Sequence, residues 1–182
     1  DAQSRWSFAW KDVPPGYYQL IAAATDDKGL TAYSNTARVT AGIQNLASGR
    51  PVAASSKDRW GGPAEYAVDG DLWTAWWADR TKKEPQWLQV DLGASQTIGA
   101  VTVLWWKACA KDYTVQVSAD GADWRTVATV EGRRPGAGYS DLQRFAPARA
   151  RYVRLYCTQP AVSWMSYAVH HLGVYDGIAG GK

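Results

Sequence analysis

The chain has 182 residues, enough for one or two domains with an apolar core. Its 20 Lys and Arg are interspersed with 17 Asp and Glu, and a net charge of +3 without a basic cluster argues against a nucleic-acid partner. The longest apolar run, residues 98–106, has the length of a strand and is too short to span a membrane. The chain begins in polar sequence without a signal peptide, so we expect a mature or excised piece of a longer protein.

Short alternating runs separated by turn-forming residues predict an all-β chain, because helical periodicity is almost absent. The first segment is expected to hold three strands, at 6–10, 17–25 and 31–40. Pro and Gly in 13–16, and Asp and Gly in 26–29, supply the turns between them.

These first residues resemble the last part of the Ig-like domains that bacteria place between modules of secreted enzymes. The resemblance lies in Phe8-Ala9-Trp10, Val13-Pro14-Pro15-Gly16-Tyr17, Ala23-Ala24-Thr25-Asp26 and Lys28-Gly29. A complete Ig-like domain has about seven strands, and three alone leave an apolar face and two edges exposed. We therefore expect this sheet to pack on its neighbour, to pair with another copy, or to have lost its other half.

A second, larger β-domain follows a junction at 41–44. Its clearest predicted strands, with a hairpin turn at 119–122, are 87–92, 98–106, 113–118, 124–130, 151–157 and 172–175. The expected division is therefore a partial Ig-like segment at 1–43, a β-domain at 44–177 and a Gly-rich tail or linker at 178–182.

Six motifs of the second domain occur in an order and spacing that resemble the discoidin domain, also called the factor V/VIII type C domain. Among bacterial proteins they resemble the family 32 carbohydrate-binding modules. The motifs are Asn45-Leu46-Ala47 with Gly49 and Pro51; Ala67-Val68-Asp69-Gly70-Asp71 with Thr74 and Trp76; Gln86-Trp87-Leu88-Gln89-Val90-Asp91-Leu92-Gly93; Tyr113-Thr114-Val115-Gln116-Val117-Ser118 with Asp120-Gly121 and Trp124; Arg151-Tyr152-Val153-Arg154-Leu155; and Val174-Tyr175. The resemblance implies an eight-stranded jelly-roll β-sandwich whose ligand-binding loops gather at one end, often with a structural cation nearby.

Alternation within the strands supports a sandwich independently of that resemblance. Val101, Val103 and Trp105 share one face of the strand at 98–106, and we expect that face to be the core face. Trp106 then points the other way, next to a loop, and becomes a candidate ligand contact.

Eleven Trp against two Phe is the most unusual feature of the composition. Trp suits half-wet sites, since it joins a large apolar face to an N–H that needs a partner, and several Trp lie in polar, turn-forming stretches. The expected carbohydrate-binding residues are Asp58, Arg59, Trp60, Trp77, Trp106, Lys107, Trp164 and Tyr167, with Trp73 and Arg80 as further candidates. Packing over the end of the sandwich stays the alternative for each Trp, while Trp76, Trp87 and Trp124 match packing positions of the family.

No residue is expected to act in catalysis. His170 and His171 are neighbours in a predicted strand, so their side chains point to opposite faces. Nucleophile elbows, zinc motifs and phosphate-binding loops are absent from the sequence. The expected role is therefore a non-catalytic part of a glycoside hydrolase or polysaccharide lyase.

The resemblance implies a structural calcium ion held by oxygen atoms of Ala67, Asp69, Asp71 and Thr74, a donor set of the kind that calcium prefers. The family places a Glu shortly before the final Val-Tyr, where this chain has His171, a poor calcium ligand. An Asp-Gly turn without an ion is the alternative.

The two cysteines, Cys109 and Cys157, lack the spacing of metal ligands. The implied jelly roll could bring both to one rim, and a secreted β-protein favours a disulfide, so we expect a Cys109–Cys157 bond. Two small buried thiols are the alternative.

The expected function is a non-catalytic carbohydrate-binding module of a secreted bacterial polysaccharide-degrading enzyme. It would bind a glucan- or chitosan-like cell-wall polysaccharide beside the catalytic module of the same parent chain. An adhesion or protein/phospholipid-binding discoidin domain is the alternative, against which the bacterial-style Ig-like segment argues. Single-stranded nucleic-acid binding through aromatic platforms is a third class, and the weak net charge argues against it.

Overall fold

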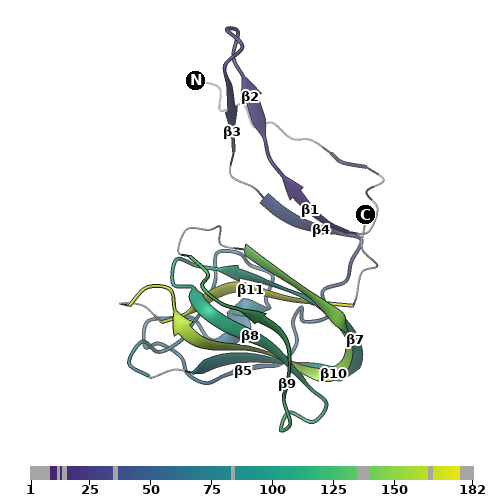
Figure 1. Cartoon of the computed structure of the whole chain (residues 1–182), viewed down its shortest axis with the longest axis vertical. Helices are drawn as coiled ribbons and strands as arrows, with labels where there is room; N and C mark the ends of the chain where they lie inside the picture. The colour runs from purple at the N-terminus through teal and green to yellow at the C-terminus, as the bar shows by residue number, and fades with distance from the viewer. Residues whose placement is uncertain are drawn as a thin grey trace. The chain divides into compact units, whose positions relative to one another are not determined.

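The structure is a computed structural model that describes residues 9–11, 13, 16–34, 37–82, 85–134, 140–163 and 166–176. The chain divides into two compact units between Gln44 and Asn45 (Figure 1). Among the described residues the one helical element is a four-residue 3-10 helix, η1 (Ala64–Ala67), so the prediction of an all-β chain is confirmed. No helix in these ranges is long and apolar enough to cross a membrane.

The N-terminal unit contains two separate pairs of antiparallel strands. These are β1 (Gly16–Leu20) with β4 (Ala37–Ala41), and β2 (Ala23–Thr25) with β3 (Thr31–Tyr33). The two long strands predicted at 17–25 and 31–40 are thus each divided in two. The strand predicted at 6–10 lies outside the described residues except for its last two positions, which are not in a strand.

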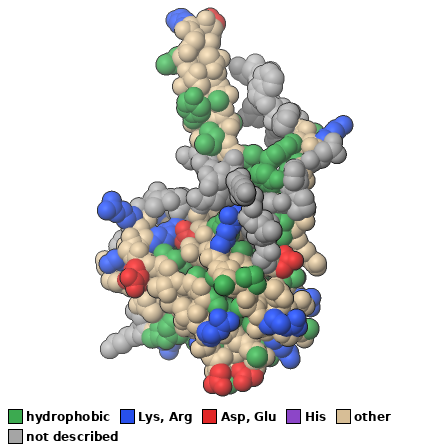
Figure 2. Space-filling view, turned by 45° about the vertical axis from the view of Figure 1, so that its right-hand side comes forward, with side chains coloured by type: hydrophobic (Ala, Val, Ile, Leu, Met, Phe, Trp, Pro, Cys, Tyr) green, Lys and Arg blue, Asp and Glu red, His purple; other side chains and the backbone are tan. Residues whose placement is uncertain are grey.

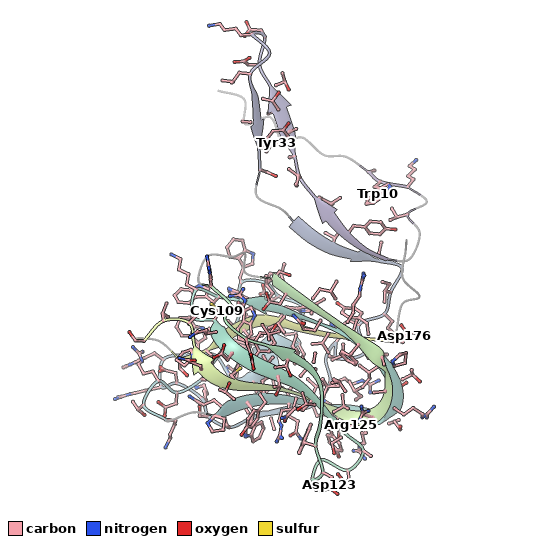
Figure 3. The ribbon with its side chains drawn as sticks, in the orientation of Figure 1. Trp10, Tyr33, Cys109, Asp123, Arg125 and Asp176 are labelled. Carbon is pink, nitrogen blue, oxygen red and sulfur yellow. The ribbon has the colours of Figure 1, made fainter. Side chains whose placement is uncertain are left out.

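The hairpin between β2 and β3 closes as its Asp-Gly sequence predicts. Asp26 Oδ1 accepts the backbone N–H groups of Lys28 (3.0 Å) and Leu30 (2.8 Å), and Gly29 has a φ of 82°. Hydrophobic side chains of this unit, among them Leu30 and Tyr33, are exposed (Figures 2 and 3). The Ig-like resemblance of this unit stays a prediction.

The second unit is a β-sandwich, as predicted. Its strands are β5 (Val52–Ala54), β6 (Trp76–Trp77), β7 (Gln86–Trp105), β8 (Ala110–Ser118), β9 (Arg125–Val130), β10 (Ser140–Pro160) and β11 (Ala168–Tyr175). The strands predicted at 87–92 and 98–106 join into the single strand β7. Strand β10 begins well ahead of the strand predicted at 151–157.

Two long strands, β7 and β10, pass from one layer of the sandwich to the other. The first half of β7 lies between β5 and the second half of β10, which pairs with β8, and β8 pairs with β9. The second half of β7 lies between β11 and the first half of β10, and β6 pairs with β11. Figure 1 shows the two long strands curving together round one side of the sandwich.

The two long strands bend together because a glycine in one lies close to a β-bulge in the other. Gly93 in β7 has a φ of 82°, and the register of β10 shifts between Ala150 and Tyr152. A bidentate ion pair closes the bend, since Arg151 Nε and Nη2 donate to the two carboxylate oxygens of Asp91 at 2.7 Å each. This hydrogen bonding holds the pKa of Asp91 below its usual value.

The core lies between the two layers and follows the alternation of the sequence. Core-facing residues of the first half of β7 are buried and the residues between them are half-buried; the buried set is Gln86, Leu88, Val90 and Leu92. Trp105 is also buried, so its predicted place in the core is confirmed, while Trp106 is half-buried. Each large apolar side chain buried in this way stabilises the sandwich by about 1.5–3 kcal/mol.

The predicted Cys109–Cys157 disulfide is wrong for this structure, in which both residues are buried thiols with no bond between them. The strand register gives the reason. Cys157 pairs with Tyr113, whereas the carbonyl of Cys109 accepts the N–H of Ala161, four positions further along. Four residues of extended strand span about 13 Å, and a disulfide joins Cα atoms less than about 7 Å apart.

Candidate functional site

Both ends of β7 lie at the end of the sandwich opposite the bend, and loops from four parts of the chain meet there. The described parts of these loops are 55–62, 78–82, 106–109, 161–163 and 166–167. Backbone hydrogen bonds tie them to β6, from Asp58 N–H to Trp77 O (2.8 Å), and to β11, from Trp106 N–H to Ala168 O (2.9 Å). A third joins two of the loops to each other, from Ala78 N–H to Tyr167 O (2.9 Å). Because these bonds satisfy groups that burial removes from water, they hold the loops in one arrangement.

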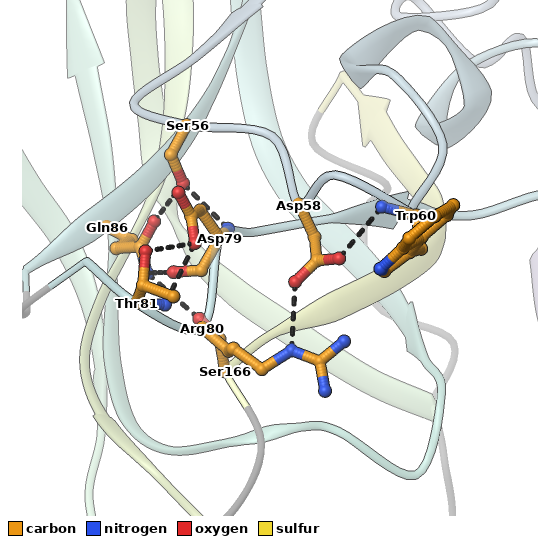
Figure 4. A network of polar contacts seen from close by, with 8 residues as sticks. All are labelled: Ser56, Asp58, Trp60, Asp79, Arg80, Thr81, Gln86 and Ser166. Atoms are coloured by element: carbon orange, nitrogen blue, oxygen red, sulfur yellow. Dashed lines mark hydrogen bonds and ion pairs between the residues drawn. The ribbon is translucent and has the colours of Figure 1, made fainter.

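A buried glutamine joins three of these loops (Figure 4). Gln86 Nε2 donates to the carbonyl of Asp79 (3.0 Å) and to Ser166 Oγ (2.9 Å), while its Oε1 accepts from Ser56 Oγ. Ser56 Oγ in turn accepts the N–H of Asp79 at 2.9 Å. The amide therefore has a partner for each donor and for its oxygen, which suits a buried polar group that fixes neighbouring backbones.

Sequence reasoning did not select Gln86 as a site residue, although one signal was present. Gln86 is the first core-facing residue of β7, two positions before Leu88 on the same face. A polar side chain at a core position needs hydrogen-bonding partners, because burying it without them costs free energy. Such a position therefore indicates a buried network.

Asp58 is a second buried polar residue that joins loops at this end of the sandwich. It is 5% exposed, and its Oδ1 accepts the backbone N–H of Trp60 at 3.0 Å while its Oδ2 accepts Arg80 Nε at 3.1 Å (Figure 4). The hydrogen bond from Arg80, followed by that from Trp60, holds the pKa of Asp58 below its ordinary value. The carboxylate thus stays charged and fixes both the loop before β6 and the loop after it.

Trp60 is the large aromatic side chain that this loop presents to solvent. It is 79% exposed, and the guanidinium carbon of Arg59 lies 4.8 Å from the centre of its ring. The turn behind it requires a glycine, since a Cβ on Gly61 would lie 2.2 Å from Trp77 Cβ. Close approach of the loop to β6 therefore fixes where Trp60 emerges.

Trp77 and Trp106 form a pair beside that loop. Their ring centres are 4.6 Å apart with planes tilted by 45°, and both side chains are half-buried. Part of each indole therefore packs against the other, and part stays accessible. Lys107 follows Trp106 and is exposed.

The structure thus brings six of the predicted binding residues to one end of the sandwich, namely Asp58, Arg59, Trp60, Trp77, Trp106 and Lys107. Tyr167 is 1% exposed and belongs to the core, so its predicted contact with a ligand is wrong. Trp164 lies outside the described residues. Trp73 is 95% exposed in another loop, the one that follows η1.

The predicted metal loop is closed by its own hydrogen bonds. Thr74 Oγ1 contacts Asp69 Oδ2 (2.8 Å) and the carbonyl of Asp71 (2.9 Å), and Asp69 Oδ1 accepts the N–H of Asp71 at 2.9 Å. Asp71 Oδ1 accepts the N–H of Trp73 at 2.9 Å. Most of the side-chain oxygen atoms that would bind calcium are therefore already hydrogen-bonded within the loop itself.

His171 lies close to this loop, where a carboxylate would be needed. Its Nδ1 is buried without a hydrogen-bond partner, and burial lowers its pKa although the charge of Asp69 opposes that shift. Among the described residues no three His, Cys, Asp or Glu side chains gather to hold a metal ion. A His in place of that carboxylate favours the Asp-Gly turn without an ion over the calcium ion, which stays a prediction.

This β-sandwich, with two strands shared between its layers and aromatic loops at one end, agrees with the discoidin class of domain that the motifs predict. The family model of the F5/8 type C domain matches residues 51–169, and the chain belongs to this family.

Similar solved structures are carbohydrate-binding modules. Chitosan-binding module 1 of the chitosanase/glucanase from Paenibacillus sp. IK-5 is 36% identical, with a TM-score of 0.66 over 72% of this chain and 98% of that chain. The module CpGH89CBM32-5 from Clostridium perfringens, solved in complex with GalNAc-β-1,3-galactose, is 25% identical, with a TM-score of 0.65 over 72% of this chain and 99% of that chain.

A relative among curated proteins is a much longer chain. The polysaccharide lyase 8 family protein HylA of Enterococcus faecalis is 39% identical over 93 residues, which are 50% of this chain and 6% of the lyase. The present chain therefore corresponds to a small part of that protein.

Proposed function

We propose that residues 45–176 form a non-catalytic carbohydrate-binding module that keeps the catalytic module of a secreted polysaccharide-degrading enzyme near its substrate. The observation that carries this proposal is Trp60, 79% exposed on a loop that a buried carboxylate fixes in place. The relatives support it, since two are carbohydrate-binding modules and a third is a polysaccharide lyase.

An exposed indole on a fixed loop suits a sugar ring, whose C–H face is apolar while its edge is polar. Trp60 supplies the flat apolar surface, and the exposed guanidinium groups of Arg59 and Arg80 supply donors for the edge. Because the loop is already held by Asp58, little conformational entropy is lost when a ligand binds. Affinity is expected to be modest, since sugar hydroxyls lose water for each hydrogen bond that they gain.

The pair formed by Trp77 and Trp106 extends this surface. Two half-buried indoles that pack against each other restrict one another, and they lie beside the loop of Trp60, where a Cβ on Gly61 would lie 2.2 Å from Trp77 Cβ. We infer that a second sugar of a chain contacts this pair, with Lys107 at its side. A binding surface with more than one aromatic contact favours an oligosaccharide or polysaccharide over a single sugar.

The sequence led us to expect a glucan- or chitosan-like polysaccharide as the ligand. The observations above support binding of a carbohydrate but do not select that class of sugar. The similar Paenibacillus module is named for chitosan, whereas the Clostridium module was solved with a galactose-containing disaccharide. Modules of one fold therefore bind different sugars. The charges of this chain's own loops are the observations that bear on the class of sugar.

Affinity electrophoresis tests the proposed function. The protein is run through native gels that contain neutral, cationic or anionic polysaccharides, and we expect at least one of them to retard it. A glycan array then ranks the sugars. A folded protein that no polysaccharide retards and that binds no glycan on the array would contradict the proposal.

A further inference from the structure

We propose that the Trp60 site binds an anionic polysaccharide whose sugars carry carboxylates, and that Arg80 binds the carboxylate. This inference rests on the proposed function and adds to it the class of sugar.

The acidic side chain next to Trp60 is not available to a ligand. Asp58 is 5% exposed, and its two oxygens accept from the N–H of Trp60 (3.0 Å) and from Arg80 Nε (3.1 Å). Its negative charge is already matched by that of Arg80. A cationic amino sugar stacked on Trp60 would therefore meet no accessible counter-charge from Asp58.

Arg80, unlike Asp58, is accessible to a ligand. It pairs with Asp58 through Nε, its side chain is 57% exposed, and no hydrogen bond from its two terminal amino groups is found among the described residues (Figure 4). Those two groups form a planar pair of charged donors, whose geometry matches the two oxygens of a carboxylate. Because Asp58 already holds the guanidinium, less side-chain entropy is lost on binding.

The loops around Trp60 carry further positive charge beside Arg80. Besides Arg80, whose charge Asp58 offsets, their exposed cationic side chains are Lys57, Arg59, Lys82 and Lys107. Of the two carboxylates described in the same loops, Asp58 is paired as above, while Asp79 keeps its charge and accepts the N–H (2.8 Å) and the O–H (2.7 Å) of Thr81 through Oδ1. The exposed cationic side chains of these loops outnumber it. Such a rim attracts a polyanion and repels protonated chitosan.

Matched ligands test the inference. Calorimetry compares an oligouronide, the same oligosaccharide after reduction of its carboxyl groups to hydroxymethyl groups, and a chitosan oligomer. We expect the oligouronide to bind about tenfold or more tightly than its reduced form, the factor that one charge-assisted hydrogen bond supplies. That preference should fall as salt is added, and chitosan should bind most weakly.

Variants of Arg80 test whether this residue causes the preference for the oligouronide over its reduced form. Arg80→Gln should lose most of the preference for the oligouronide over its reduced form, a ratio in which any loss of affinity common to both ligands cancels. Arg80→Lys keeps a charge beside Asp58 without the planar pair of donors, and it should also lose much of that preference while staying folded. The control is Arg125→Gln, an exposed arginine paired with the far end of β8 (Figure 3), which should leave all affinities unchanged.

Equal binding of the oligouronide and its reduced form, or an unchanged preference in both Arg80 variants, would overturn the inference and leave the proposed function intact. Tighter binding of a sulfated neutral glucan than of the oligouronide would overturn the assignment of a carboxylate. Failure of every oligosaccharide to bind would count against the proposed function itself.

Discussion

The candidate site combines a buried side chain, Asp58, which holds its neighbours in position, with an exposed side chain, Trp60, which can contact a ligand. Asp58 binds the N–H of Trp60 and the guanidinium of Arg80, and so positions two groups that can contact a ligand without touching it itself. Trp60 presents most of its indole to solvent. A rigid exposed platform of this kind needs a fixed support, and the support here is electrostatic.

The pH dependence of stability tests that support. The pKa of Asp58 is lowered in the folded protein, so its charge adds stability above the ordinary value of 3.8, and this contribution is lost as the pH falls through the folded pKa. We expect Asp58→Asn to be less stable than the wild type at pH 7, and the gap to close as the pH falls below about 4. Urea unfolding at a series of pH values measures both proteins, and a gap that stays constant down to acid pH would contradict the account.

At this scale the sequence predicted the exposed residues of the site better than the buried ones. Trp60, Arg59 and Lys107 lie in polar loops, and the structure leaves all three exposed. Tyr167 lies in an equally polar stretch but starts the approach to β11, and its ring enters the core. Loop composition does not reveal which way a side chain points, because that depends on the strand that follows.

At the scale of elements, β7 and β10 decide where the loops meet. Alternation of apolar residues predicted the two halves of β7 and the second half of β10. The first half of β10 was not predicted, because Pro147 and the bulge between Arg144 and Ala148 interrupt its alternation. Partners far away in sequence supply the register there, and no local pattern carries that information.

Gln86 in β7 forms hydrogen bonds to three of the loops, and its replacement tests how much those bonds stabilise the fold. Gln86→Ala leaves Ser56, Ser166 and the carbonyl of Asp79 without their buried partner, so we expect a loss of about 1–3 kcal/mol in the free energy of unfolding. Gln89→Ala is the matched control, on the same strand but half-buried on the other face, with an expected effect of about 0.5 kcal/mol or less. Equal losses in the two variants would show that the buried network has no special role.

The loop between η1 and β6 makes a second element-scale prediction. Thr74 and backbone groups bind the carboxylates of Asp69 and Asp71, and His171 stands where the resemblance led us to expect a carboxylate. We therefore expect the melting temperature to be the same after exhaustive chelation and in millimolar calcium. A ligand that binds the folded state raises the melting temperature by mass action, so a clear rise with calcium would show that the loop binds the ion.

At the scale of the whole molecule, the chain consists of two units that divide between Gln44 and Asn45. Asn45 belongs to the second unit, since its Oδ1 accepts the N–H groups of Ala47 (3.0 Å) and Val174 (2.9 Å). The sandwich contains its own core, and this is the property that lets a domain fold alone. The composition and spacing of the motifs were enough to predict the sandwich, because many separate residues agree on it.

Truncation tests the independence of the sandwich. A variant that begins at Gly42 keeps Asn45 and all strands from β5 to β11, and we expect its melting temperature to lie within about 2 °C of that of the sandwich in the full chain. Differential scanning calorimetry and carbohydrate affinity are measured on both proteins. A large fall in either would show that the first unit supports the second.

Binding of an oligosaccharide by Trp60→Ala tests the central claim most directly, with Trp73→Ala as the matched control. Both side chains are exposed, Trp60 at 79% and Trp73 at 95%, but Trp73 lies in the separate loop after η1. By analogy with base stacking, loss of the Trp60 platform should weaken binding by about 1–3 kcal/mol, while Trp73→Ala should bind as the wild type does. Calorimetry gives the affinities, and near-ultraviolet circular dichroism confirms the fold of each variant. Wild-type affinity in a folded Trp60→Ala, or an equal loss in Trp73→Ala, would contradict the assignment of the carbohydrate-binding site.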